Sequence, residues 1–264
     1  MDIIQALILA LLQGLTEFLP ISSSGHLILP SELLGWPDQG LAFDVAVHVG
    51  TLLAVLVYFR NDVSALIKGW FASVSGHNNQ HGQLAWCLIL ATVPAALAGL
   101  VFDDIIETHM RSTQVIASTT IVFGVLLGLA DKVPGREREL LDIGWRIALI
   151  IGCAQALALI PGTSRSGITI TAALFLGFSR QSAAQFSFLM SISIILLSGG
   201  YKGLQLLGTT AVDWSLIALG VAVSAISAYL CIYYFLAFIN RIGMMPFVYY
   251  RLALGFTLLG IAWL

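Results

Sequence analysis

Two polar clusters interrupt a sequence that is otherwise mostly apolar, and their residue types suit phosphate chemistry. The first contains Glu17, three serines at residues 22–24 and His26, while the second, at residues 161–167, reads Pro-Gly-Thr-Ser-Arg-Ser-Gly. The guanidinium group of Arg165 matches phosphate oxygens as a two-pronged donor. A serine or histidine near a carboxylate can act as a nucleophile or a base. The two clusters are therefore candidates for a site that binds and hydrolyses a phosphate group.

The composition indicates that lipid surrounds these clusters. Of the 264 residues, 58% are apolar and only 10% are charged, and the mean hydropathy is +0.94. Soluble domains carry about a quarter charged residues, so this chain is predicted to be an integral membrane protein. The net charge of −2 argues against nucleic acid as a partner, because binding nucleic acid needs a basic face.

Six apolar runs are predicted to form transmembrane helices, at residues 43–59, 84–102, 115–130, 185–197, 214–238 and 247–264, although the fourth is short. A helix needs about 20 residues to cross a bilayer. Each polar cluster instead follows an apolar helix and precedes a run that is too short to cross, at residues 27–34 and 168–178. We therefore expect each cluster to be the tip of a re-entrant helical hairpin.

The two hairpin regions share one layout, which predicts an internal repeat. Each has an apolar helix, a proline, a tip rich in Ser and Gly, a short helix, and then a span that opens with phenylalanine. The predicted fold is an all-α integral membrane protein with an inverted repeat, two re-entrant helical hairpins and about six transmembrane helices. Residues 1–264 form a single transmembrane domain, with repeat one at about 1–130 and repeat two at about 145–264.

Loop charges predict the orientation, since Lys and Arg concentrate on the cytoplasmic side. If residues 60–83 form a cytoplasmic loop, nine of the twelve Lys and Arg residues lie inside, Arg136 and Arg251 among them. Arg111 and Lys202 then lie outside, and Arg165 lies on the second tip. In this arrangement both termini face outward, the hairpins enter from opposite sides, and their tips meet near the bilayer midplane.

Helix N-termini favour anions, and the short helices after the tips aim theirs at one point. The side chains and backbone amides predicted to bind a phosphate group there are those of Ser22, Ser24, Gly25, Thr163, Ser164, Ser166 and Gly167. Purely structural roles remain open: Glu17 could only pair with Arg165, His26 could be a core histidine, and the serines could only cap helices. Asp44 and His48, four residues apart on one span, are interpreted as a hydrogen-bonded pair.

Both tip sequences, with residues 43–52 and 185–189, resemble the undecaprenyl-diphosphate phosphatase (bacitracin-resistance) family, and the likeness covers essentially the whole chain. The resemblance implies a multi-pass enzyme of the bacterial inner membrane, acting on the periplasmic side. It would release the terminal phosphate of undecaprenyl diphosphate, with a divalent metal, and recycle the lipid carrier of cell-wall synthesis. It assigns catalysis to Ser23, His26, Glu17 and Arg165.

The family's metal positions fall on Gln13 and Glu17, so one of the two carboxylates found in some members is replaced here by an amide. The metal, expected to be Mg²⁺ with Ca²⁺ as an alternative, would then be held largely through substrate phosphates. The other expected partners are the polyprenyl diphosphate substrate and membrane lipids, and the chain could form a homodimer.

The favoured mechanism makes Ser23 the nucleophile and His26 its base, with Glu17 orienting His26 or binding metal. Attack by His26 itself is the close alternative. A lipid flippase or transporter that uses the same anion site without cleavage is the alternative from another functional class.

Overall fold

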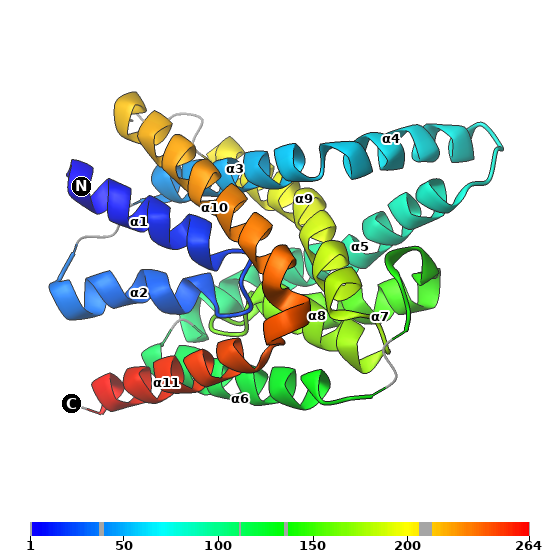
Figure 1. The fold of residues 1–264 in the computed structure, drawn as a ribbon. Helices are drawn as coiled ribbons and strands as arrows, with labels where there is room; N and C mark the ends of the chain where they lie inside the picture. Colours follow the sequence, from blue (N-terminus) through cyan, green and yellow to red (C-terminus); the bar gives the residue numbers. More distant parts are fainter. Residues whose placement is uncertain (1, 37–39, 111, 135–136, 206–212, 264) are drawn as a thin grey trace.

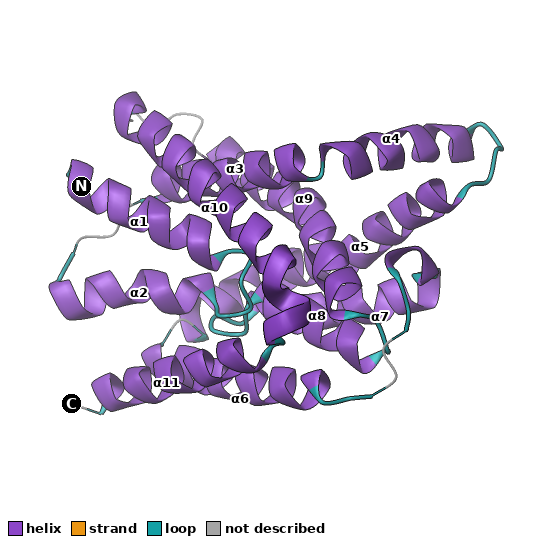
Figure 2. Ribbon diagram, in the orientation of Figure 1, coloured by secondary structure: helices purple, strands orange, loops and turns teal. Residues whose placement is uncertain are grey.

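The apolar runs fold into helices in the computed structural model, which describes residues 2–36, 40–110, 112–134, 137–205 and 213–263. No strand occurs within these ranges (Figure 2). Arg111 and Arg136, which the charge analysis used, lie outside them.

Six helices are long and apolar enough to cross a membrane, as predicted, so the chain is a multi-pass membrane protein. They are α3 (Leu41–Tyr58), α5 (Gln80–His109), α6 (Thr113–Asp131), α9 (Arg180–Gln205), α10 (Trp214–Ile242) and α11 (Met245–Ala262). Helix α9 is much longer than the run at residues 185–197, and the serines inside that run are accommodated in the helix. Their hydroxyls donate to carbonyls one turn back, as in Ser191 Oγ to Phe188 O at 2.6 Å and Ser193 Oγ to Met190 O at 3.0 Å.

Helix α4 (Arg60–Val74) corrects the prediction that residues 60–83 form a loop. Its buried positions include Leu66 and Gly69, and an added Cβ at Gly69 would lie 2.6 Å from the backbone nitrogen of Gly82 in α5. The two helices therefore pack closely as a hairpin. The turn of this hairpin lies at the end of the molecule opposite to the two termini (Figure 1).

The predicted hairpins consist of short helices: α1 (Ile3–Thr16) with α2 (Ser23–Leu34), and α7 (Trp145–Ala156), extended by the 3₁₀ turn η2 (Leu157–Leu159), with α8 (Arg165–Phe175). At 1.5 Å per residue the 14 residues of α1 extend about 21 Å, less than the hydrocarbon core of about 30 Å. Re-entrant placement in the bilayer stays a prediction.

The two halves have the same helix order once α4 is set aside, α1-α2-α3-α5-α6 in one and α7-α8-α9-α10-α11 in the other. Their packing corresponds as well: α1 packs against α10 and α7 packs against α5, while α6 packs against α11. The loops that end α1 and α7 are thereby brought together at the centre of the helix assembly (Figures 1 and 2).

An ion pair joins the elements at the end of the molecule away from the termini. Arg180, which begins α9, donates through Nε to Asp131 Oδ1 at 2.7 Å, and Asp131 ends α6. The backbone N–H of Met244 also donates to Asp131 Oδ2 at 3.2 Å. Because Asp131 is buried, this carboxylate fixes the turn between α10 and α11 relative to α6 and α9.

Candidate active site

The two tips have the same local conformation. Ser22 and Ser164 stand directly before α2 and α8 in left-handed backbone, with φ of 75° and 69°. The Oγ of Ser164 accepts from the N–H of Gly167 at 3.1 Å, and that of Ser22 accepts from the N–H of Gly25 at 3.4 Å. A left-handed non-glycine residue costs about 1–3 kcal/mol and persists only where its surroundings enforce it. Both helices therefore begin with a capped, sharply turned N-terminus.

The tips contact each other directly. Arg165 Nη2 donates to Glu17 Oε1 at 2.9 Å, joining residues 148 positions apart, and both side chains are largely buried. Ser166 Oγ donates to the backbone carbonyl of Leu19 at 2.9 Å. The structure thus places Arg165 of the second tip against Glu17 of the first.

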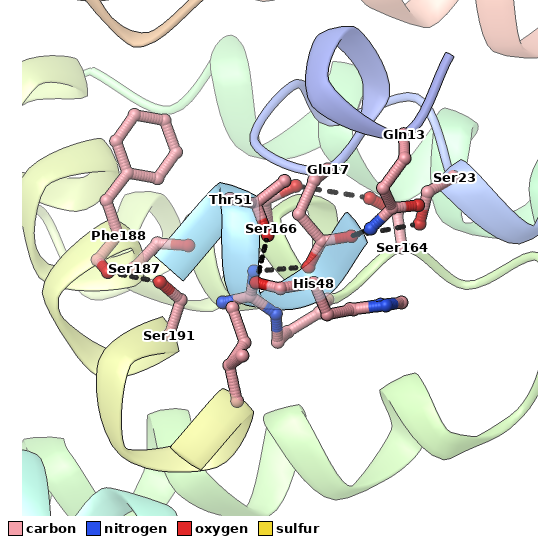
Figure 3. A network of polar contacts seen from close by, with 12 residues as sticks. Gln13, Glu17, Ser23, His48, Thr51, Ser164, Ser166, Ser187, Phe188 and Ser191 are labelled. Atoms are coloured by element: carbon pink, nitrogen blue, oxygen red, sulfur yellow. Dashed lines mark hydrogen bonds and ion pairs between the residues drawn. The ribbon is translucent and has the colours of Figure 1, made fainter. Parts of the chain in front are cut away.

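Glu17 is the centre of this polar network. Its Oε2 accepts from Gln13 Nε2 at 2.9 Å and from Ser23 Oγ at 3.2 Å. Gln13 lies one turn before Glu17 at the end of α1, and Ser23 is the first residue of α2 (Figure 3). The carboxylate therefore binds Arg165 through one oxygen and the Ser23 hydroxyl through the other.

His26 is not hydrogen-bonded to Ser23, contrary to the arrangement that the favoured mechanism required. Its Nδ1 donates to the carbonyl of Ser22 at 2.7 Å, and its Nε2 lies 2.6 Å from the hydroxyl of Tyr250. A neutral imidazole that donates through Nδ1 accepts through Nε2, so Tyr250 is the donor to such a ring. The rings of His26 and Tyr250 are also stacked, with centroids 5.4 Å apart. The oxygen that accepts from Ser23 is instead that of Glu17.

Three buried polar atoms of the site have no hydrogen-bond partner among the described residues: Gln13 Oε1, Thr163 Oγ1 and Arg165 Nη1. Gln13 and Thr163 are fully buried. A buried donor or acceptor without a partner costs about 1–3 kcal/mol. Two of these atoms, an N–H nitrogen and a hydroxyl oxygen, suit phosphate oxygens, and the third, an amide oxygen, suits a hard cation. A phosphate group with a bound cation would satisfy all three.

The remaining predicted residues lie on the same two tips. Ser166 and Gly167 occupy the buried first turn of α8, and Gly25 occupies that of α2. The side chain of Ser24 lies outside the described residues. His48 joins the cluster from α3 (Figure 3), and its Nδ1 donates to the backbone carbonyl of Asp44 at 2.7 Å, so the predicted pair is joined through the main chain.

Helices α6 and α11 supply contacts that the sequence analysis missed. Thr119 Oγ1 donates to Pro161 O at 2.6 Å and Thr120 Oγ1 to Gly162 O at 3.2 Å, so α6 holds the second tip. From α11, Tyr250 contacts His26, and Arg251 is fully buried rather than part of a cytoplasmic loop. The signal for Arg251 was available, because an ionisable residue within an apolar run indicates a functional position.

Metal ligands are sparse at this site. No group of three or more His, Cys, Asp or Glu side chains within the described part of the chain is placed to hold a metal ion. The oxygens of Gln13 and Glu17 are hard ligands and fit a divalent cation that takes its other ligands from phosphate and water.

A family model described as bacitracin resistance protein BacA matches residues 6–257. The chain belongs to the BacA family. A relative named undecaprenyl-diphosphatase from Teredinibacter turnerae is 68% identical over 98% of both chains. Relatives of the same name from Saccharophagus degradans and Aliivibrio salmonicida are 64% and 58% identical, over 100% of this chain and 99% of theirs. These names give no support to the flippase alternative.

Proposed function

We propose that this BacA-family chain is an undecaprenyl-diphosphate phosphatase. It hydrolyses undecaprenyl diphosphate to undecaprenyl phosphate and inorganic phosphate, recycles the lipid carrier of cell-wall synthesis and confers bacitracin resistance. The observation that carries the proposal is the contact of Arg165 with Glu17, because it joins two distant tips into one site that also contains Ser23. Relatives with this activity in their names match the full length of the chain.

The terminal phosphate binds between the N-termini of α2 and α8. Their free N–H groups and positive dipole ends favour an anion, and the unpartnered Nη1 of Arg165 donates to a phosphate oxygen. Thr163 Oγ1 supplies a second donor from the same tip. The ion pair with Glu17 holds the guanidinium group in place before substrate arrives.

Ser23 attacks the terminal phosphorus in line with the bridging oxygen. Its proton passes to Glu17, whose carboxylate already accepts from the hydroxyl. The new Oγ–P bond replaces the bond to the bridging oxygen, which leaves with undecaprenyl phosphate, and water then cleaves the phosphoserine to release phosphate. His26, fixed by Ser22 and Tyr250, orients the first turn of α2 in this scheme, and its direct attack is the competing route.

A divalent cation, Mg²⁺ or alternatively Ca²⁺, would be held by Gln13 and Glu17 together with substrate oxygens. It would supply positive charge against the charge that develops on the phosphoryl group. The fully buried Gln13 oxygen without a described partner supports this assignment.

Both hairpins are re-entrant in this proposal, so the site lies within the bacterial inner membrane and opens to the periplasm. Outward-facing termini and a cytoplasmic α4–α5 turn agree with the positions of these segments at opposite ends of the molecule (Figure 1). The substrate's prenyl chain then stays in the lipid while its head group reaches the tips.

The deciding measurement is phosphate release from undecaprenyl diphosphate by the purified protein in detergent. We expect Ser23→Ala to lower the rate by at least a hundredfold while the protein stays folded, and a chelator to lower the wild-type rate. Ser118→Ala removes an exposed α6 hydroxyl that donates to Gln114 O within its own helix, so it should behave as wild type. Lipid binding without phosphate release by the wild type would refute the proposal.

A further inference from the structure

Among the described residues, Arg251 is the largest of the fully buried side chains, and it lies in the second turn of α11. Burying a cation costs several kcal/mol unless other groups replace its water. A buried arginine in a membrane helix therefore indicates a structural or functional role. The proposed mechanism assigns no such role to Arg251, because Arg165 already holds the phosphate.

The side chain of Arg251 donates its hydrogen bonds to backbone carbonyls. Its Nε donates to Thr120 O on α6 at 3.1 Å, and its Nη1 donates to Pro20 O on the first tip at 3.3 Å. Its Nη2 donates to two carbonyls of the second tip, Gly162 O and Thr163 O, both at 3.0 Å. One guanidinium group thus binds both tips and the helix that supports the second tip.

Glycines on two other helices make room for this side chain. A Cβ at Gly167, in the first turn of α8, would lie 2.9 Å from Arg251 Nη1, and a Cβ at Gly124, on α6, would lie 3.0 Å from Arg251 Cβ. Real Cβ atoms essentially never come as close as the first distance, and the second is tighter than nine in ten real contacts, so a larger residue at either position would push against the Arg251 side chain. Two separate close approaches to one side chain indicate that its position is built into the fold.

The charge of Arg251 is balanced by carbonyl dipoles. No ion pair between described residues includes it, whereas Arg165 and Arg180 each pair with a carboxylate. A cation without a carboxylate partner adds positive potential to its surroundings, and here its surroundings are the two tips. The same group can therefore set the tip geometry and favour an anion between the tips.

We propose that Arg251 is a positioning residue: it holds the two tips at the separation that brings Ser23 and Arg165 to opposite oxygens of Glu17. This inference rests on the proposed function for its effect on catalysis. Its structural part, the coupling between the tips, is independent of that function.

The experiment has two readouts on Arg251→Met and Arg251→Lys, with Arg241→Met as control because Arg241 is exposed near the end of α10. The first is the rate at which a short bifunctional thiol reagent cross-links the two thiols introduced by Ser23→Cys and Arg165→Cys. The native Cys87, Cys153 and Cys231 are replaced by alanine in this background. The second is kcat and KM for phosphate release in the otherwise native chain.

We expect Arg251→Met to slow cross-linking at least fivefold and to lower kcat at least tenfold, with a smaller change in KM. Arg251→Lys keeps the charge but has one nitrogen in place of three, so it should restore part of kcat.

Cross-linking at the wild-type rate in Arg251→Met would overturn the inference, whatever happens to kcat. If Arg251→Met does not fold, Arg251→Lys decides, and wild-type values in both of its readouts would overturn the inference. If Arg251→Met slows cross-linking but the wild-type chain itself releases no phosphate, the coupling between the tips is supported and the proposed function is refuted.

Discussion

Replacement of Arg165 by lysine tests the phosphate site most directly, because it keeps the charge and removes the two-pronged geometry. In the structure Nη2 is bound to Glu17 at 2.9 Å, and Nη1 is buried without a partner in the described part of the chain. Lysine ends in a single nitrogen, so it can keep the contact with Glu17 or donate to the phosphate, but it cannot copy both in this geometry.

The loss is therefore one charge-assisted hydrogen bond to the phosphoryl group. Such a bond contributes about 1.5–3 kcal/mol. A loss of that size from the transition state corresponds to a fall of about 10- to 150-fold in kcat/KM.

The assay is the initial rate of phosphate release from undecaprenyl diphosphate in detergent, over a range of substrate concentrations and at matched amounts of folded protein. Arg241→Lys, the same change at an exposed arginine, should leave kcat/KM unchanged. If Arg165→Lys stays within threefold of wild type, the second Arg165 nitrogen does not bind the reacting phosphate, and the proposed arrangement of the site fails.

Three further outcomes are expected. Gly167→Ala should lower activity at least tenfold, since its Cβ would lie 2.9 Å from Arg251 Nη1. The control Gly199→Ala, whose Cβ would meet nothing within 4 Å, should leave activity intact. Equal activities of the two variants would contradict the close packing of Gly167 against Arg251. Asp131→Ala should destabilise the detergent-solubilised protein by about 1–3 kcal/mol, because the Arg180 guanidinium group loses its acceptor. An unchanged thermal unfolding midpoint would contradict this stabilising role of Asp131. A phosphoenzyme trapped in acid should survive and carry its phosphate on Ser23, while an acid-labile adduct would identify His26 as the nucleophile.

The tip residues could be found from sequence because polar and charged side chains stand out in apolar runs. Glu17, Ser23 and Arg165 were assigned to one site from residue type, and the structure places Ser23 Oγ and Arg165 Nη2 within 3.2 Å of the same carboxylate. The six spans were equally visible, since length and hydropathy nearly suffice to define them.

The supporting contacts could not be found in this way, because they join side chains to distant backbone carbonyls. The bond from Arg251 to Pro20 O connects positions 231 residues apart, and nothing in the residue type of Pro20 indicates it. Counting Arg251 among the cytoplasmic charges predicted a solvent-exposed side chain, although Arg251 lies within an apolar run and is buried in the structure. Similarly, the charged residues of α4 lowered its hydropathy and hid the helical spacing of Val63, Leu66, Ile67 and Trp70.

The correspondence between the tips explains how one scaffold supplies two different functions. Ser22 and Ser164 have the same left-handed backbone and the same cap to a glycine three residues later, so Ser23 and Arg165 are equivalent first residues of their helices. In one half this position carries a hydroxyl, and in the other half it carries a guanidinium group. Because the halves pack reciprocally, the two positions meet across Glu17 rather than lying at separate surfaces.

Exchanging the residues by Ser23→Arg with Arg165→Ser would keep both groups but move each to the wrong side of the Glu17 carboxylate. We therefore expect no phosphate release from the exchanged protein, and measurable activity would show that the asymmetry of Glu17 does not matter.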